Sequence, residues 1–218
     1  MTFTRWMARL ALLIAMPLTL AACGINTIPT QEERAKAQWA EVQNQYQRRA
    51  DLIPNLVATV KGYAAQESSV LIGVTQARAN ALQVRSDPGI TQDPAAFQRY
   101  AAAQNNLSLA LAPMRVLQEA YPDLKSNENF LALQSQLEGT ENRITVARKD
   151  YNEAVRDYNT TLRTFPQIIW AKTVHGGSKP MELFQATATA QSAPTVDFGA
   201  PAVGTPPAGA APGSPPPK

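Results

Sequence analysis

Cys23 and His175 are the only thiol and the only imidazole in the 218 residues of this chain. One of each is too few for a zinc site or a disulfide framework built within a single chain. A di-iron bundle needs a Glu-x-x-His motif on each of two helices. His175 lies beyond the last long helix that we predict, between Val174 and two glycines. We therefore expect no metal, no cofactor and no catalytic residue, and we predict that the protein is not an enzyme.

The surroundings of Cys23 favour lipid attachment. Arg5 and Arg9 precede an apolar run, LALLIAMPLTL at residues 10–20, which is too short to span a bilayer and is typical of a secretory leader. The following Leu-Ala-Ala-Cys at 20–23 resembles a bacterial lipobox. We predict a lipoprotein signal peptide at 1–22, an acylated (palmitate-bearing) Cys23 and a lipid-anchored linker at 23–30. Two alternatives are an ordinary cleaved signal with a spare thiol and an uncleaved membrane anchor.

The charge balance argues against a nucleic-acid partner. The formal net charge is +3, and it falls to +1 once Arg5 and Arg9 leave with the leader. Nucleic-acid binding requires basic residues clustered on one face, and the mature chain shows no such cluster. The partners we expect are the lipid bilayer, reached through acylated Cys23, and an envelope or integral-membrane protein.

The elements that must position any site are helices. Apolar residues recur in alternating steps of three and four, which is the spacing of one face of a helix. The seams are Ala35, Trp39, Val42, Tyr46, Ile53; Leu56, Val60, Tyr63, Glu67, Val70, Val74, Ala77, Ala81; Tyr100, Leu107, Leu111, Met114, Tyr121; and Phe130, Leu133, Leu137, Thr140, Ile144, Ala147, Tyr151, Ala154, Tyr158, Thr161, Phe165. They predict an all-α fold, an antiparallel bundle of about four long, coiled-coil-like helices.

Proline and turn residues set the expected helix ends. Pro54 suits a first helical turn, so we expect a break or kink at 51–53. Asp87-Pro88-Gly89 predicts a turn, and Asp93-Pro94 an N-cap followed by a proline in the first turn. Tyr121-Pro122-Asp123 should end the third helix, and Pro113 should kink it.

The pattern changes after residue 165. Residues 167–184 mix apolar residues with Gly176, Gly177 and Pro180, which indicates a strap lying on the bundle. Residues 185–218 carry almost no charge and are rich in proline, alanine and glycine, which predicts a disordered tail. The expected domain is therefore a helical bundle with a C-terminal strap at 31–184, followed by the tail at 185–218.

Glu67 is the most unusual residue of the predicted seams. A carboxylate on an apolar face must be paired, protonated or turned to solvent, because an isolated buried charge is costly. We predict a structural ion pair, with Arg49, Arg143 or Arg148 as candidate partners, or a register-fixing polar contact; a solvent-accessible rim position and a functional site are the alternatives.

Arg48, Arg49 and Asp51 lie at the predicted break. We expect them either to cap and pair around it or to form a docking patch for another envelope protein.

Several segments resemble the LemA family. These are residues 42–57, VQNQYQRRADLIPNLV; 60–63, VKGY; 120–125, AYPDLK, with 128–130, ENF; 141–144, ENRI; 147–152, ARKDYN; and 195–198, TVDF. The resemblance covers about residues 36–198 and implies an all-α antiparallel bundle on a membrane-attached, extracytoplasmic protein. It supplies no catalytic residues. The chain departs from the family pattern in carrying a lipobox, where relatives have a transmembrane segment, and in having Pro113.

The favoured function is a membrane-tethered, non-catalytic lipoprotein of the bacterial cell envelope that binds or scaffolds another envelope protein. It would face the periplasm or the exterior, and Gly24 after the cysteine favours the outer membrane. The alternative is an envelope hydrolase or glycan-active protein that uses carboxylates we cannot place. A carrier of lipid or another small ligand within the bundle is a third reading.

Overall fold

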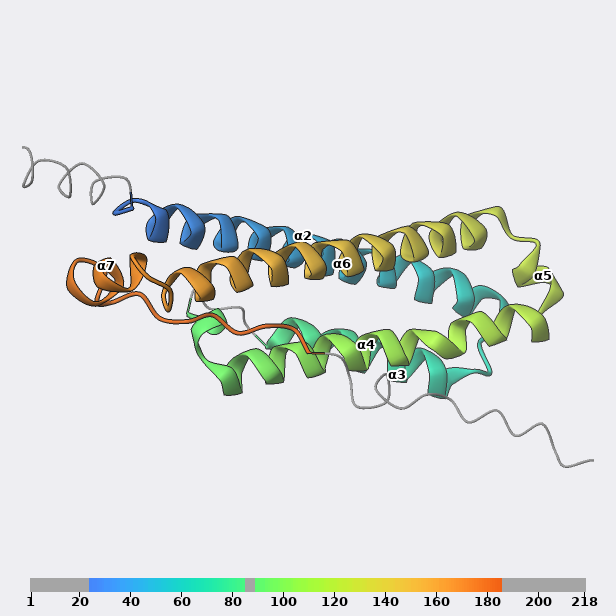
Figure 1. Ribbon diagram of the computed structural model, residues 1–218. Helices are drawn as coiled ribbons and strands as arrows, with labels where there is room; N and C mark the ends of the chain where they lie inside the picture. The colour runs from blue at the N-terminus through green and yellow to red at the C-terminus, as the bar shows by residue number, and fades with distance from the viewer. Residues whose placement is uncertain (1–23, 85–88, 186–218) are drawn as a thin grey trace, which may run out of the picture. The chain divides into compact units, whose positions relative to one another are not determined.

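The computed structural model describes residues 24–84 and 89–185, and in these residues the fold is entirely helical, without a strand (Figure 1). The predicted all-α class is confirmed. The elements are α2 (Thr27–Tyr63), α3 (Ser68–Gln83), η1 (Ile90–Gln92), α4 (Pro94–Ala120), α5 (Pro122–Lys125), α6 (Glu128–Thr161) and α7 (Gln167–Thr173). They belong to one compact unit that ends at Phe184. Residues 1–22, Cys23, Asp87-Pro88 and residues 186–218, on which several predictions fall, lie outside the described residues.

The long helices form two antiparallel pairs that are stacked on each other. α2 and α6 pair along their length: contacts join Arg34 to Asp157, Arg49 to Glu141 and Tyr63 to Asn127, so the residue number falls in α6 as it rises in α2. α3 and α4 pair in the same sense, with Glu67 bound to Tyr121 and Ala81 to Gln104. Figure 1 shows the two pairs as two layers.

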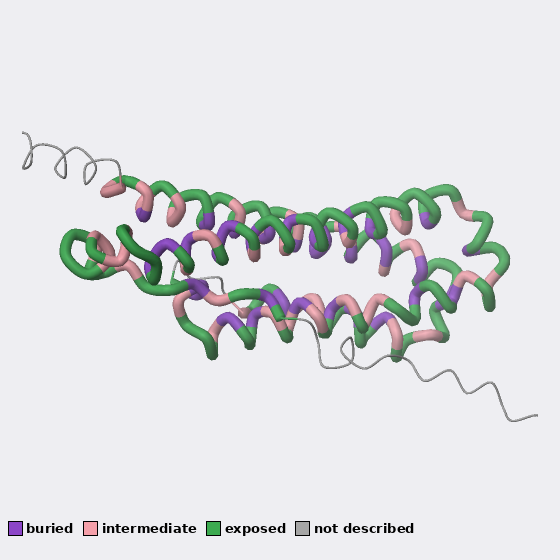
Figure 2. The backbone as a smooth tube through the Cα atoms, in the orientation of Figure 1, coloured by how far each residue is buried: buried purple, intermediate pink, exposed green. Residues whose placement is uncertain are grey.

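The core lies on the sides of the helices that face one another (Figure 2). An aromatic cluster that includes Trp39, Phe97, Tyr100, Tyr151 and Phe184 fills the part next to the strap. An aliphatic cluster around Ile53, Leu56, Val74, Leu107 and Leu137 fills the part next to α5. A polar side chain that is buried between these clusters therefore needs a hydrogen-bond partner from the protein.

The seam predicted for the fourth long helix is confirmed almost throughout α6. Nine of its eleven residues are buried, from Phe130 to Thr161, and Asn127 caps the helix by accepting a hydrogen bond from the Phe130 N–H at 2.9 Å. Leu133 is only partly buried, and Phe165 is 79% exposed. Phe165 is outside the core because α6 ends at Thr161, four residues earlier than predicted.

Of the break or kink predicted at 51–53, the break is wrong, because α2 continues through Pro54. Proline has no N–H, so the carbonyl of Ala50, four residues earlier, loses its helical partner. Arg78 of α3 replaces that partner: its Nε donates to the Ala50 oxygen at 2.7 Å. A helix whose proline would normally disrupt it is thus supported from the neighbouring helix.

This replacement predicts a coupling between residues 54 and 78. We expect Arg78→Ala to lower the free energy of unfolding by about 1–2 kcal/mol, because it leaves a buried carbonyl without a donor. In a Pro54→Ala background the restored N–H can bond to Ala50, and Arg78→Ala should then cost less than half as much. A double-mutant cycle by urea denaturation measures the difference. Equal costs in both backgrounds would show that Arg78 does not serve this carbonyl.

The predicted second seam is divided between two helices. α2 ends at Tyr63, the chain reverses at residues 64–67, and α3 begins at Ser68 with Glu67 as its N-cap residue. The reversal lets Leu71 and Val74 pack back against α2 within the aliphatic cluster. Gly62, the last residue but one of α2, is the weak signal of this reversal in the sequence.

The predicted start and end of the third long helix are confirmed. The Asp93 side chain accepts from the N–H groups of Ala95 and Ala96, Pro94 opens α4, and Tyr121 follows its last residue. Pro113 lies inside the helix, which continues through it to Ala120. Leu109, whose carbonyl lacks a partner because of Pro113, is 71% exposed, so water can reach that carbonyl.

Residues 167–184 form the helix α7 and then an extended strap on α6. The side-chain amides of Asn152 and Asn159 each exchange two hydrogen bonds, of 2.8–2.9 Å, with the backbone of Phe184 and of Met181. Seven helical residues rise about 10.5 Å and three extended residues span about 10 Å. A pair of asparagines seven apart therefore matches backbone groups three apart, which fixes the register of the strap.

No helix of the described residues combines the length and the hydrophobicity needed to cross a bilayer.

Candidate functional site: a groove beside a buried arginine

Arg49 of α2 is the charged residue at the centre of the bundle, with only 1% of its surface exposed. Its Nη1 donates to Ser108 Oγ at 2.6 Å and to Glu141 Oε1 at 2.7 Å. Its Nη2 donates to the backbone oxygen of Gln104 at 3.1 Å and to its Oε1 at 2.7 Å. One guanidinium thereby joins α2 to α4 and to α6.

One of the buried tyrosines of the bundle packs against the arginine. The guanidinium carbon of Arg49 lies 5.1 Å from the centre of the Tyr46 ring, an arrangement that favours the cation. Burial raises the pKa of the Tyr46 hydroxyl, and it raises the pKa of Tyr100 and of Tyr151 strongly. These hydroxyls therefore stay protonated at neutral pH and are unsuited to act as bases.

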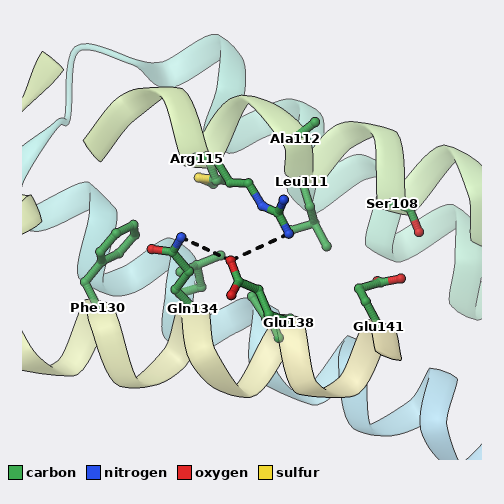
Figure 3. A pocket seen from close by; sticks show the side chains of 11 residues that line it. Ser108, Leu111, Ala112, Arg115, Phe130, Gln134, Glu138 and Glu141 are labelled. Carbon is green, nitrogen blue, oxygen red and sulfur yellow. Dashed lines mark hydrogen bonds and ion pairs between the residues drawn. The ribbon is translucent and has the colours of Figure 1, made fainter. Parts of the chain in front are cut away.

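A groove opens between α4 and α6 beside the arginine (Figure 3). Its volume is about 260 Å³, and its floor is apolar, formed by Leu56, Leu111, Met114, Phe130 and Leu137. Ser108 and Glu141, both bound to Arg49, form one end.

The mouth of the groove is polar. Arg115 Nη2 and Glu138 Oε1 face each other across it at 3.7 Å, and Gln134 donates to the same Glu138 oxygen at 3.4 Å (Figure 3). Both partners of this ion pair are about half-exposed, so water screens it and it can open at little cost. The groove can therefore admit an apolar group past a polar rim.

The groove is suited to binding an apolar group. Its volume is below the ~300–1,000 Å³ of sites for drug-sized ligands, yet an apolar cavity of ~150 Å³ can hold benzene. One or two apolar side chains would fill it, whereas a bulky cofactor would not.

Catalytic groups are poorly arranged around the same groove. The Ser108 hydroxyl accepts a hydrogen bond from Arg49. No histidine or lysine lines the groove to act as a base for that hydroxyl. Glu138 and Glu141 are each paired with an arginine, whereas a general acid must hold a proton. Within residues 24–84 and 89–185 no group of three or more His, Cys, Asp or Glu side chains could hold a metal ion.

The comparison with protein families decides the relationship that the motifs indicated. The model of the LemA family matches residues 38–198, which is more than half of the chain. The chain belongs to the LemA family. Both partners of the buried ion pair, Arg49 and Glu141, lie in segments that carry the LemA resemblance.

The chain is also similar to magnetosome proteins. It is 26% identical over 157 residues to "Magnetosome protein MamQ 2" and to "Magnetosome protein MamQ 1" of Paramagnetospirillum magneticum strain AMB-1. It is 24% identical over 157 residues to "Magnetosome protein MamQ" of Magnetospirillum gryphiswaldense strain MSR-1. Each match covers 65% of this chain and 58% of the relative, so the chain spans less than two thirds of these proteins. LemA membership is consistent with a membrane-associated protein.

The LemA bundle does not contain the ion pair predicted for Glu67. Glu67 is half-buried at the start of α3 and accepts a hydrogen bond from the Tyr121 hydroxyl at 2.9 Å, which raises the pKa of that tyrosine. Arg49 pairs instead with Glu141, and Arg143 is exposed. Arg148 lies with its guanidinium carbon 4.4 Å from the centre of the Phe184 ring. The ion pair is not formed because the turn at 64–67 takes Glu67 off the seam. The hydrogen bond from Tyr121 and the partial exposure of Glu67 are compatible with the predicted polar contact and with the rim position.

The predicted docking patch lies only partly on the surface. Arg48 and Asp51 are exposed, but Arg49 is buried, and all three lie within the continuous α2 rather than at a joint. Gln47 donates to Asp51 at 2.7 Å one turn along the helix. Arg49 is thus unavailable for docking, and docking through Arg48 and Asp51 stays a prediction.

Of the single cysteine and the single histidine, the structure describes His175 but not Cys23. Cys23 lies outside the described residues, so its acylation remains a proposal. His175 Nε2 lies 2.9 Å from the backbone oxygen of Ile25 and connects the segment after α7 to the start of the bundle.

Sequence reasoning missed Glu141, Ser108 and Gln104. One signal was available for Gln104, which is four residues after Tyr100 and three before Leu107 and so falls on the apolar face of α4. A polar residue on such a face needs a buried partner, and Arg49 is that partner.

Proposed function

We propose that the protein is a lipid-tethered, non-catalytic helical lipoprotein of the bacterial cell envelope that binds or scaffolds another envelope protein. The observation that carries the proposal is the α4–α6 groove, which has an apolar floor, a polar mouth and no catalytic pair beside it. The leader and the Leu-Ala-Ala-Cys sequence support the tether through acylated Cys23, because a chain bearing several acyl groups anchors stably.

The occupant of the groove in this proposal is an apolar side chain of the partner protein. The floor of the groove would bury that side chain next to Ser108 and Glu141. The hydrogen bonds of Arg49 to these two residues fix α4 and α6 in position without ligand. A binding site that is already formed loses little conformational entropy on binding. The Arg115–Glu138 pair at the mouth would then contact polar groups of the partner around the buried side chain.

A variant in which a bulky side chain fills the groove tests this function. Ala112 lines the groove, and Ala112→Trp would occupy it; Ala58, an exposed alanine of α2, gives the matched Ala58→Trp control. A photo-crosslinking residue at position 111 in intact membranes should capture an envelope protein, which is then purified. We expect Ala112→Trp to raise the Kd of the purified pair at least about tenfold, which is 1.4 kcal/mol, and Ala58→Trp to leave it unchanged.

Two outcomes would overturn the proposal. One is that no protein is captured from position 111 above the level captured with Cys23→Ala, which removes the tether. The other is that Ala112→Trp and Ala58→Trp bind the captured protein equally well.

A further inference from the structure

The α3–α4 pair differs from the α2–α6 pair in its charge. α6 carries ten charged residues in 34 and α2 nine in 37, which is typical of a solvated helix surface. α4 carries three in 27, Arg99, Arg115 and Glu119, and α3 carries Arg78 alone in 16. Arg78 binds the Ala50 carbonyl and Arg115 faces the groove, so these two charges are directed away from the outer side of the pair.

Two uncharged stripes run along this outer side. Exposed residues of α4 recur in alternating steps of four and three, and so lie on one face of the helix: Ala102, Asn106, Leu109, Pro113, Val116 and Ala120. Exposed Arg99, three residues before Ala102, continues this row and is its charged end. Exposed residues of α3 follow the same spacing: Ser69, Gly73, Gln76 and Asn80. We call these ten residues the α3–α4 face.

The α3–α4 face has the character of a helix-packing surface. Leu109 and Val116, seven residues apart, are 71% and 69% exposed and project as the large apolar groups of the α4 stripe. Ala102, Gly73 and Ser69 are small enough to let another helix come close. In the α2–α6 pair the same heptad spacing is buried between helices, whereas here it has no partner within the described residues.

We propose that the α3–α4 face binds a second copy of this chain, forming a symmetric dimer. A two-fold interface places each surface against the same surface of the other copy. Charges of one sign would then repel each other across the interface, whereas an uncharged surface meets no such repulsion. The 27 residues of α4 are about 40 Å long and the 16 residues of α3 about 24 Å, and each helix is about 10 Å wide. The face therefore offers about 640 Å² per protomer, or about 1,300 Å² in a dimer, which is at the lower end of the range of specific interfaces.

A membrane is a poorer occupant than a second copy. Helices that lie in a bilayer surface use lysine and arginine on the polar side and large aromatic residues as anchors. The α3–α4 face contains neither. It is also separate from the α4–α6 groove, so this inference does not depend on the proposed function.

Sedimentation equilibrium of the full-length protein in density-matched detergent tests the dimer. We expect wild-type protein to be dimeric at about 10 µM, in the range of transient homodimers, and Leu109→Glu/Val116→Glu to weaken association at least about 30-fold, because two carboxylates per protomer would be buried against their copies. Leu131→Glu/Val146→Glu is the matched control, since both residues are exposed apolar residues of α6, 47% and 57% exposed. Its association constant should equal that of wild type.

Either of two results would overturn the proposal: wild-type protein that is monomeric at 100 µM, or equal association of the two glutamate variants. Circular dichroism and thermal melting of each variant establish that a loss of association is not a loss of fold.

Discussion

Glu141→Ala is expected to lower the free energy of unfolding by about 3–5 kcal/mol, the usual cost of removing one partner from a buried ion pair. The substitution leaves the Arg49 guanidinium, 1% exposed, with only the neutral oxygens of Ser108 and Gln104. Arg49→Met is expected to cost less, because the carboxylate it leaves behind belongs to a side chain that is 34% exposed and can be hydrated. Urea denaturation followed by circular dichroism gives both values.

A second substitution makes this expectation sharper. Because the cost of Glu141→Ala is mainly that of an uncompensated buried cation, Glu141→Ala/Arg49→Met should be more stable than Glu141→Ala alone. Glu138→Ala is the matched control: Glu138 lines the same groove, but its pair with Arg115 is exposed and should contribute less than about 1 kcal/mol. A double variant that is less stable than Glu141→Ala would show that Arg49 stabilises the bundle through its packing rather than through its paired charge.

The buried arginine also shows where the sequence stops being informative. Charged side chains are rarely buried, so a position with Arg48 and Asp51 as neighbours is expected on the surface. Arg49 is nevertheless in the core because Ser108, Gln104 and Glu141 lie 59, 55 and 92 positions away and meet it only after folding. Pro54 failed as a helix start for the same reason, since the donor that replaces its N–H comes from Arg78, 28 positions from Ala50.

The apolar periodicity was more informative, because it reports directly which side of a helix is buried. The α6 seam could be predicted to within about one turn at its end, and Asp93 could be recognised by residue type and position as a helix cap. LemA membership followed from contiguous motifs. The groove could not be predicted, since it depends on how far α4 stands from α6 and not on the pattern of either helix.

Phe184→Ala is expected to lower the free energy of unfolding by about 3–5 kcal/mol, as for other buried phenylalanines. Phe184 is 7% exposed, and its ring centre lies 4.8 Å from that of Phe97, 5.6 Å from Tyr151 and 5.9 Å from Trp39. These rings come from α4, α6 and α2, so a residue of the strap closes the aromatic cluster between three helices. The substitution removes packing from all three contacts at once, and thermal and urea unfolding measure the loss.

Phe165→Ala removes the same side chain from a position that is 79% exposed, and it should change stability by less than about 0.5 kcal/mol. Hydrogen exchange supplies a second readout, because the Phe184 N–H donates to Asn152 Oδ1 and the Met181 N–H to Asn159 Oδ1. In Phe184→Ala both amides should exchange faster than the amides of α6. If both remain as protected as those of α6, the hydrogen bonds of the strap hold it in place, and the aromatic cluster stabilises the bundle without fixing the strap.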